Sequence, residues 1–175
     1  DYNSANLAKT DIKINGENML SANYTVDLSS ASNAAGLMAT AINLNTGVHG
    51  AVADAFNTVT SKPKGDFKMT TTFSVNSATI NIATSYTELV ANINEAASGI
   101  NAKLNEDNTI TLANTDGDDI VLAAISSGAG ITDVGFTAGT YAGFIGIENL
   151  DGSAVQIEAG SIKNVYGDTT TVATG

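Results

Sequence analysis

The sequence has 175 residues, of which 43% are hydrophobic and 14% are charged, with a formal net charge of -11 and no cysteine. The length allows one domain or two small ones. Seven basic side chains cannot offset phosphate repulsion, so the composition excludes nucleic acid and anionic membranes as partners, and the lack of cysteine excludes disulfides and thiolate chemistry.

From the sequence we expect neither a membrane span nor a signal peptide. No run of about 18 apolar residues predicts a membrane span, and residues 1–10 have neither the charged nor the apolar region of a signal peptide. Polar residues interrupt apolar ones at regular spacing, which indicates an ordered, β-rich chain. We expect it to be a piece of a longer protein.

The chain begins with a predicted β-hairpin. Over residues 10–16, Ile12 and Ile14 alternate with polar residues, which is the period of a strand with one buried face. Asn15 and Gly16 tolerate a positive φ and predict the tight turn. Residues 19–28 are the expected return strand.

A helix and a strand are expected next. Leu37, Ala41 and Leu44 recur at helical spacing, and Gly47 predicts the end of that helix. Residues 48–60 follow as a predicted strand.

The single proline lies in residues 61–66 (SKPKGD), a segment typical of a linker. It predicts a boundary between a first subdomain, residues 1–64, and a second, residues 65–175.

The second subdomain repeats the pattern. Residues 68–83 predict a strand pair, and a helix follows in which Ser85 is the N-cap and Glu88 completes a capping box. We expect Leu89, Ile93 and Ala96 to form its buried stripe and Gly99 to end it. The remaining predicted strands are residues 100–104, 109–114 and 118–126, and a further hairpin covers residues 143–160.

Two stretches of the chain match each other. TAINLNTGVHGAVAD (residues 40–54) and VANINEAASGINAKL (residues 90–104) each carry an Ile-Asn pair late in a helix, followed by a glycine that precedes a strand. In this match Gly47 corresponds to Gly99. A period of roughly fifty residues indicates a repeated architectural unit.

These elements predict an α+β fold of two small, mostly antiparallel β-sheet subdomains, each packed with one helix, plus a β-hairpin. The expected core residues are Leu37, Leu44, Leu89, Ile93, Ile110, Leu112, Ile120 and Val121.

Residues 114–119 (NTDGDD) superficially resemble a calcium loop. Such a loop also needs a later bidentate Glu, whereas here an apolar strand begins at Ile120. We therefore interpret this segment as a tight turn around Gly117, and residues 149–152 in the same way. The polar members of the two turns are Asn114, Asp116, Asp118, Asp119, Asn149 and Asp151.

Few residues suggest catalysis. His49 is the only histidine, and we expect it on a strand surface; a Ser-His-Asp triad stays open, although no nucleophile-elbow motif is present. Glu88, Glu95 and Glu106 could supply the two carboxylates of a glycosidase. However, there is no Trp for a sugar platform, and Glu88 and Glu95 fit a helix cap and a helix surface.

Modification sites are equally sparse. Residues 23–25 (Asn-Tyr-Thr) form an N-glycosylation triplet, and the Ser/Thr clusters at residues 70–74 and 169–175 could accept O-linked sugar. No phosphate-binding loop is present. We expect no catalytic, cofactor-binding or metal-binding residue, no cofactor and no enzymatic activity.

The order of these motifs resembles a known family. A strand, an NG-type turn, a strand, a helix ending in AIN or NIN and a further strand resemble the insertion repeat of bacterial flagellins. In their variable central region, two such repeats precede a hairpin with a DG turn, and IGIENLDGSAVQIEAGSIKNVYG (residues 145–167) is similar to it. The resemblance covers roughly residues 10–167.

The resemblance implies a surface-exposed structural module of the extracellular flagellar filament, contributing to motility and antigenicity. Other flagellin subunits would be contacted through terminal helices outside this sequence, and antibodies or host surfaces are further partners. Three alternatives stay open: a domain of the filament-capping protein, an extracellular adhesin or carbohydrate-binding module, and a glycoside hydrolase.

Overall fold

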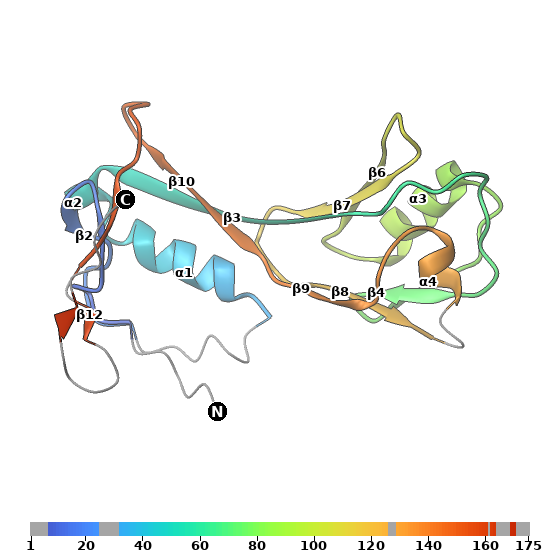
Figure 1. Cartoon of the computed structure of the whole chain (residues 1–175), viewed down its shortest axis with the longest axis horizontal. Coiled ribbons are helices and arrows are strands. Elements are labelled where there is room, and N and C mark those ends of the chain that lie inside the picture. Colours follow the sequence, from blue (N-terminus) through green and yellow to red (C-terminus); the bar gives the residue numbers. More distant parts are fainter. Residues whose placement is uncertain (1–6, 25–31, 126–128, 161, 164–168, 171–175) are drawn as a thin grey trace. The chain divides into compact units, whose positions relative to one another are not determined.

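The structure is a computed structural model that describes residues 7–24, 32–125, 129–160, 162–163 and 169–170 (Figure 1). It has the α+β fold predicted from the sequence, with antiparallel strands and few helices. The chain forms two compact units. Unit 1 comprises residues 1–55 and 145–175, and unit 2 comprises residues 56–144.

Unit 1 is built from both ends of the chain. Its three-stranded sheet has the order β11-β1-β2, and β10 lies next to β3. The β1–β2 turn is the predicted one, since Asn15 and Gly16 have φ values of 53° and 81°. The elements are β1 (Ile12–Ile14), β2 (Glu17–Asn18), α1 (Ala34–Asn43), α2 (Thr46–His49), β3 (Ala51–Thr60, whose second half belongs to unit 2), β10 (Phe144–Asn149), β11 (Ile157–Ala159), β12 (Ile162–Lys163) and β13 (Thr169–Thr170).

Unit 2 has a sheet of order β5-β4-β8-β9, while β7 lies between β3 and β6. Helix α3 packs on β5 and β6. The elements are β4 (Phe73–Val75), β5 (Ala78–Ile80), α3 (Tyr86–Ala96), β6 (Asn101–Leu104), β7 (Ile110–Asn114), β8 (Ile120–Ala124), α4 (Ala129–Asp133) and β9 (Gly139–Tyr141).

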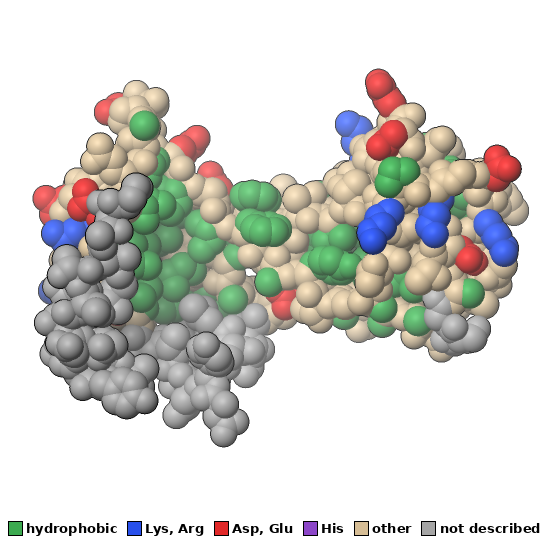
Figure 2. Space-filling view, in the orientation of Figure 1, with side chains coloured by type: hydrophobic (Ala, Val, Ile, Leu, Met, Phe, Trp, Pro, Cys, Tyr) green, Lys and Arg blue, Asp and Glu red, His purple; other side chains and the backbone are tan. Residues whose placement is uncertain are grey.

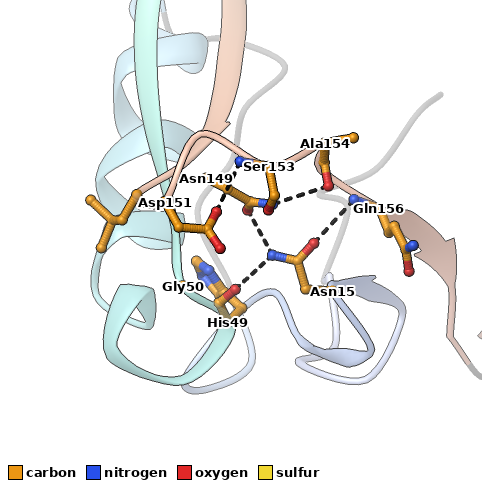
Figure 3. A pocket seen from close by; sticks show the side chains of 9 residues that line it. Asn15, His49, Gly50, Asn149, Asp151, Ser153, Ala154 and Gln156 are labelled. Atoms are coloured by element: carbon orange, nitrogen blue, oxygen red, sulfur yellow. Dashed lines mark hydrogen bonds between the residues drawn. The ribbon is translucent and has the colours of Figure 1, made fainter.

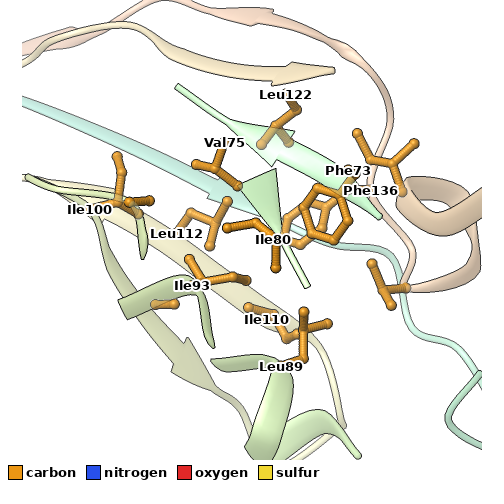
Figure 4. Packing of buried hydrophobic residues seen from close by; sticks show 14 of the residues in the cluster. Phe73, Val75, Ile80, Leu89, Ile93, Ile100, Ile110, Leu112, Leu122 and Phe136 are labelled. Atoms are coloured by element: carbon orange, nitrogen blue, oxygen red, sulfur yellow. The ribbon is translucent and has the colours of Figure 1, made fainter. Parts of the chain in front are cut away.

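The core of unit 2 forms where α3 meets the strands. Leu89 and Ile93 of α3 are fully buried and face Ile80, Ile110 and Leu112 (Figure 4). Leu and Ile recur four residues apart, so both side chains project from one face of the helix. The predicted core positions Leu89, Ile93, Ile110, Leu112 and Ile120 are confirmed.

The start of α3 also agrees with the sequence. The Ser85 hydroxyl accepts a hydrogen bond from the Glu88 amide (3.1 Å), as an N-cap does. The Glu88 carboxylate accepts from the amide and the hydroxyl of Thr84 (2.7 and 2.6 Å), one residue earlier than a capping box predicts. Ala96 was expected in the buried stripe but is exposed, and Ala97 is buried instead.

The repeat seen in the sequence is present as a repeated hydrogen-bond arrangement. The Asn43 side chain donates to the Ala53 carbonyl (2.8 Å) and accepts from the Ala53 amide (2.7 Å). In unit 2, Asn94 makes the same two bonds with Ala102 (3.0 and 2.7 Å). Each asparagine thereby fastens the end of a helix to the strand that follows it.

A second match joins the hairpin turn to the last strand of each unit. The backbone amide of Asn15 donates to the Gln156 carbonyl (2.8 Å), and the side-chain oxygen of Asn15 accepts from the backbone amide of Gln156 (3.1 Å). Asn76 makes the same pair of bonds with Val121 (2.9 and 2.7 Å). This pairs residues 149–157 (NLDGSAVQI) with residues 114–122 (NTDGDDIVL).

One β-β-α-β-β-β arrangement therefore occurs twice. Strands and helix β1, β2, α1, β3, β10 and β11 of unit 1 correspond to β4, β5, α3, β6, β7 and β8 of unit 2. Because β10 and β11 follow unit 2 in the chain, the second copy is inserted between the fourth and fifth elements of the first. Residues 143–160, predicted as a hairpin, instead supply the last two strands of the first copy: β10 pairs with β3 and β11 pairs with β1, so the two strands belong to different sheets.

This connectivity differs from the predicted subdomains, residues 1–64 and 65–175. The predicted linker, residues 61–66, lies inside unit 2 and is held there by hydrogen bonds. Ser61 is buried and exchanges bonds with Ile110 (2.9 Å each), and the Lys62 amide donates to the Gly135 carbonyl (2.8 Å). The segment with the proline and two lysines is therefore an anchored loop of unit 2 and not a boundary between domains.

Several local predictions in unit 1 were wrong. Helix α1 ends at Asn43, and the left-handed glycine before the strand is Gly50 (φ 73°), not Gly47, which lies within α2. The return strand is β2, ahead of the predicted residues 19–28. Of those residues, Met19 donates its amide to the Ile12 carbonyl (3.0 Å) and Tyr24 forms an isolated antiparallel bridge with Leu7, while residues 25–28 lie outside the described part.

Three predicted core residues are not in the core. Leu44 is 74% exposed and Leu37 is half-buried, because α1 packs through Ala35, Ala39, Ala41 and Ile42 instead. Val121 is 37% exposed, since its neighbours Ile120 and Leu122 face inward on β8.

Candidate functional site

A pocket of about 690 Å³ opens in unit 1 (Figure 3). Its residues come from three connections: the β1–β2 turn, the junction of α2 with β3, and the turn between β10 and β11. The lining residues are Asn15, His49, Gly50, Asn149, Leu150, Asp151, Ser153, Ala154 and Gln156.

Asn15 fixes these connections to one another. Its side-chain nitrogen donates to the His49 carbonyl (2.8 Å) and to the side-chain oxygen of Asn149 (2.7 Å), and its side-chain oxygen accepts from the Gln156 amide. The positive φ that the tight turn imposes on Asn15 is tolerated by this residue type. The carboxamide of Asn15 therefore forms an ordered floor for the pocket.

The 149–154 turn is held from within. Asn149 donates to the Ser153 hydroxyl (3.0 Å) and to the Ala154 carbonyl (3.1 Å), and Asp151 accepts from the Ser153 amide (2.9 Å). Hydrogen bonds from the Ser153 side chain and backbone lower the pKa of Asp151 below its usual value. The Asp151 carboxylate is thus ionised and exposed at the rim.

His49 is 3% exposed, so its predicted place on a strand surface is wrong. It is the last residue of α2, where one ring nitrogen, Nδ1, accepts from the Ala51 amide (3.2 Å). The other, Nε2, then carries the hydrogen and donates to the Ile42 carbonyl (3.2 Å). Both nitrogens bond to the backbone, so this histidine supports the α2–β3 junction.

The acidic segment at residues 114–119 forms a turn between β7 and β8. Gly117 has a φ of 75°, and the Asp116 carboxylate accepts from the Asp118 amide (3.1 Å). Burial, then the neighbouring charges of Asp116 and Asp119, raise the pKa of Asp118. Within the described ranges, no three His, Asp or Glu side chains are placed to hold a metal ion.

The three glutamates considered as glycosidase carboxylates lie in different environments. Glu88 caps α3, and hydrogen bonds from the Thr84 hydroxyl and amide lower its pKa. Glu95 lines a pocket of about 280 Å³ with Thr79, Asn81, Asn92 and Ala96, and neither other glutamate takes part in it. Glu106 is exposed in the β6–β7 turn.

The candidate glycosylation sites are described only in part. Asn23 is exposed, and its side-chain oxygen accepts from the Lys9 amide (3.1 Å), while Thr25 lies outside the described residues. Thr70 is exposed, and both its hydroxyl and its amide donate to Asp133 (2.6 and 3.0 Å). Of the cluster at residues 169–175, the structure describes only the strand β13.

The asparagines that fix the fold, Asn15, Asn43, Asn76 and Asn94, were not singled out as functional by the sequence. The Ile-Asn pairs pointed to two of them. The similarity of residues 114–117 (NTDG) to residues 149–152 (NLDG) is the sequence signal for the correspondence of the last strands, β8 and β11.

The chain matches no family model, and no curated protein is significantly similar to it. None of the helices in the described part is long and apolar enough to cross a bilayer. On the face shown in Figure 2, unit 2 presents largely uncharged polar and backbone atoms with charged side chains of both signs among them, whereas hydrophobic side chains gather on the described part of unit 1.

Proposed function

We propose that this chain is the outer, surface-exposed structural module of a bacterial flagellar filament subunit. The proposal starts from the resemblance of the ordered motifs to the central region of flagellins. The observation that carries it is the repeated β-β-α-β-β-β arrangement, with the same asparagine bonds in each copy.

The use of the polar side chains supports a structural role. The side-chain amides of Asn43 and Asn94 hydrogen-bond to backbone atoms, and Glu88 caps a helix. Both ring nitrogens of His49 are also hydrogen-bonded to the backbone. A group whose donors and acceptors are consumed by the fold is poorly suited to act on a substrate. We therefore propose that the chain is not an enzyme and needs no cofactor.

The surface composition suits an extracellular setting. A net charge of -11 favours solubility of a densely displayed module. We propose that it contacts antibodies and host surfaces, that neighbouring subunits join through helices outside this chain, and that neither nucleic acid nor a membrane is a partner.

Immunogold electron microscopy of cells that make the protein tests this proposal. Antibodies raised against this chain should label filaments along their whole length. Label confined to the filament tip would assign the chain to the capping protein. Label on the cell body alone would contradict any filament role.

A further inference from the structure

The Asn15 pocket, defined above by its nine lining residues, has the size of a small-ligand site. Its volume of about 690 Å³ falls within the range of about 300–1,000 Å³ that is usual for such sites. The floor is held by hydrogen bonds that the Asn15 side chain donates to His49 and Asn149 and accepts from the Gln156 amide. The connections that carry the lining residues are therefore already fixed before a ligand binds, which lowers the entropic cost of binding.

Unit 2 acts as an internal control for the pocket residues. The turn-forming residues Asn149, Asp151 and Gly152 have the counterparts Asn114, Asp116 and Gly117. Four other lining residues of this segment are not matched in kind: Leu150, Ser153, Ala154 and Gln156 correspond to Thr115, Asp118, Asp119 and Val121. The fold forms with either set, so these four residues are not dictated by the turn.

The free polar groups lie on both sides of the floor. Figure 3 shows Asp151 and Gln156 on opposite sides of Asn15. Asp151 accepts from the Ser153 amide and from the Ser153 side chain, and a carboxylate has further acceptor capacity. Gln156 bonds to Asn15 through its backbone, and among the described residues its side-chain amide has no partner.

The charge of the lining narrows the ligand class. No lysine lines the pocket and the His49 nitrogens are occupied, so an anion has no partner there. One carboxylate is too few for calcium, which takes six to eight oxygens. A neutral molecule with several hydroxyls can both donate to Asp151 and exchange bonds with the amide of Gln156. Leu150, 67% accessible, also lines the pocket and offers an apolar surface.

We propose that the Asn15 pocket binds a neutral sugar residue. Asp151 and Gln156 hydrogen-bond its hydroxyls from two sides, and Leu150 contacts its apolar edge. All residues of the site belong to unit 1. The proposal of sugar binding is therefore independent of the proposal that the chain belongs to a filament.

The test is a titration of the isotope-labelled chain with glucose, galactose and N-acetylglucosamine, followed by NMR chemical shifts. At least one probe should shift the amides of residues 150–156 in a saturable way, with millimolar affinity. Gln156→Val installs the residue found at this position in unit 2 and should weaken binding about fivefold, the effect of roughly one lost hydrogen bond. Val121→Gln, made in unit 2, is the matched control and should leave binding unchanged.

Gln156→Val should fold normally, because only the backbone of Gln156 bonds to Asn15. An unchanged melting temperature checks this, and Asp151→Asn, whose amide oxygen still accepts from the Ser153 amide, gives a second variant that should also weaken binding. Absence of saturable shifts with all three sugars would overturn the proposal. So would shifts that neither Gln156→Val nor Asp151→Asn reduces.

Discussion

Asn94→Ala tests the bond arrangement that defines the repeat. The substitution removes two hydrogen bonds, of 3.0 and 2.7 Å, between the end of α3 and Ala102 of β6. Each contributes about 1 kcal/mol net, so the loss should be about 2 kcal/mol. Ala102 is 5% exposed, so its freed amide and carbonyl recover little from water, and the loss should not be smaller.

Asn92→Ala is the matched control, because Asn92 lies on the same helix and its side chain reaches only the Asn81 carbonyl at 3.5 Å. It should cost no more than about 0.5 kcal/mol. Thermal unfolding followed by circular dichroism, supported by urea titration, measures both variants. For a unit of this size, 2 kcal/mol lowers the melting temperature by about 10 °C. Equal stability of Asn94→Ala and Asn92→Ala would refute the reasoning.

Three other substitutions test separate parts of the account. Ile93→Ala removes a fully buried side chain and should lower the free energy of unfolding, measured in urea, by about 2–5 kcal/mol. Leu44→Ala, at a 74% exposed position, should change it by no more than about 0.5 kcal/mol. Similar losses for the two variants would contradict the assignment of the core. Gly135→Ala places a Cβ against the Lys62 carbonyl oxygen at a φ of 86°, and should lower the free energy of unfolding by at least about 2 kcal/mol. Gly65→Ala, where a Cβ meets open space, is the control and should be neutral or stabilising. An unchanged stability of Gly135→Ala would show that the loop at residues 61–66 is not anchored there. Asp118→Asn should be more stable than the parent at pH 7, because the raised pKa of Asp118 means that its ionised form opposes folding. That advantage should vanish as the pH falls below about 3.9, the ordinary Asp value in the unfolded chain, where the parent is protonated in both states, and a less stable variant at pH 7 would contradict the sign.

Local chemistry made much of unit 2 predictable. Ser85 and Glu88 mark the start of α3, Leu89 and Ile93 share its buried face, and strands β6 and β7 flank a short polar turn. In each case the determinants lie within a few residues of one another. Such signals survive in a single sequence because they depend on backbone preference and side-chain period.

Unit 1 was less predictable because its determinants are distant in the chain. Strand β11 pairs with β1 across more than half of the sequence, and Asn15 bonds to Gln156. Periodicity carries no information about which strand will pair with which. Helix α1 shows the same limit, since its buried face uses alanines such as Ala35 and Ala39, while the larger Leu44 faces solvent. Size alone therefore selected the wrong face.

The pocket followed from the same long-range pairing. The sequence marked His49, Asp151 and Asn15 as separate features, a lone histidine and two turns. The structure brings them together only because β10 and β11 return beside β3 and β1. A turn motif predicts its own geometry, but not the neighbours against which it closes.

The proposed role is tested most directly by peptide mass spectrometry of filaments sheared from living cells that make the protein. The tryptic peptide of residues 69–103 lies in unit 2 between Lys68 and Lys103 and reports the chain without ambiguity. If the chain is part of a filament subunit, this peptide should be among the most abundant components of the purified filaments. Its presence only in the cell bodies or the culture medium, with intact filaments lacking it, would contradict the account.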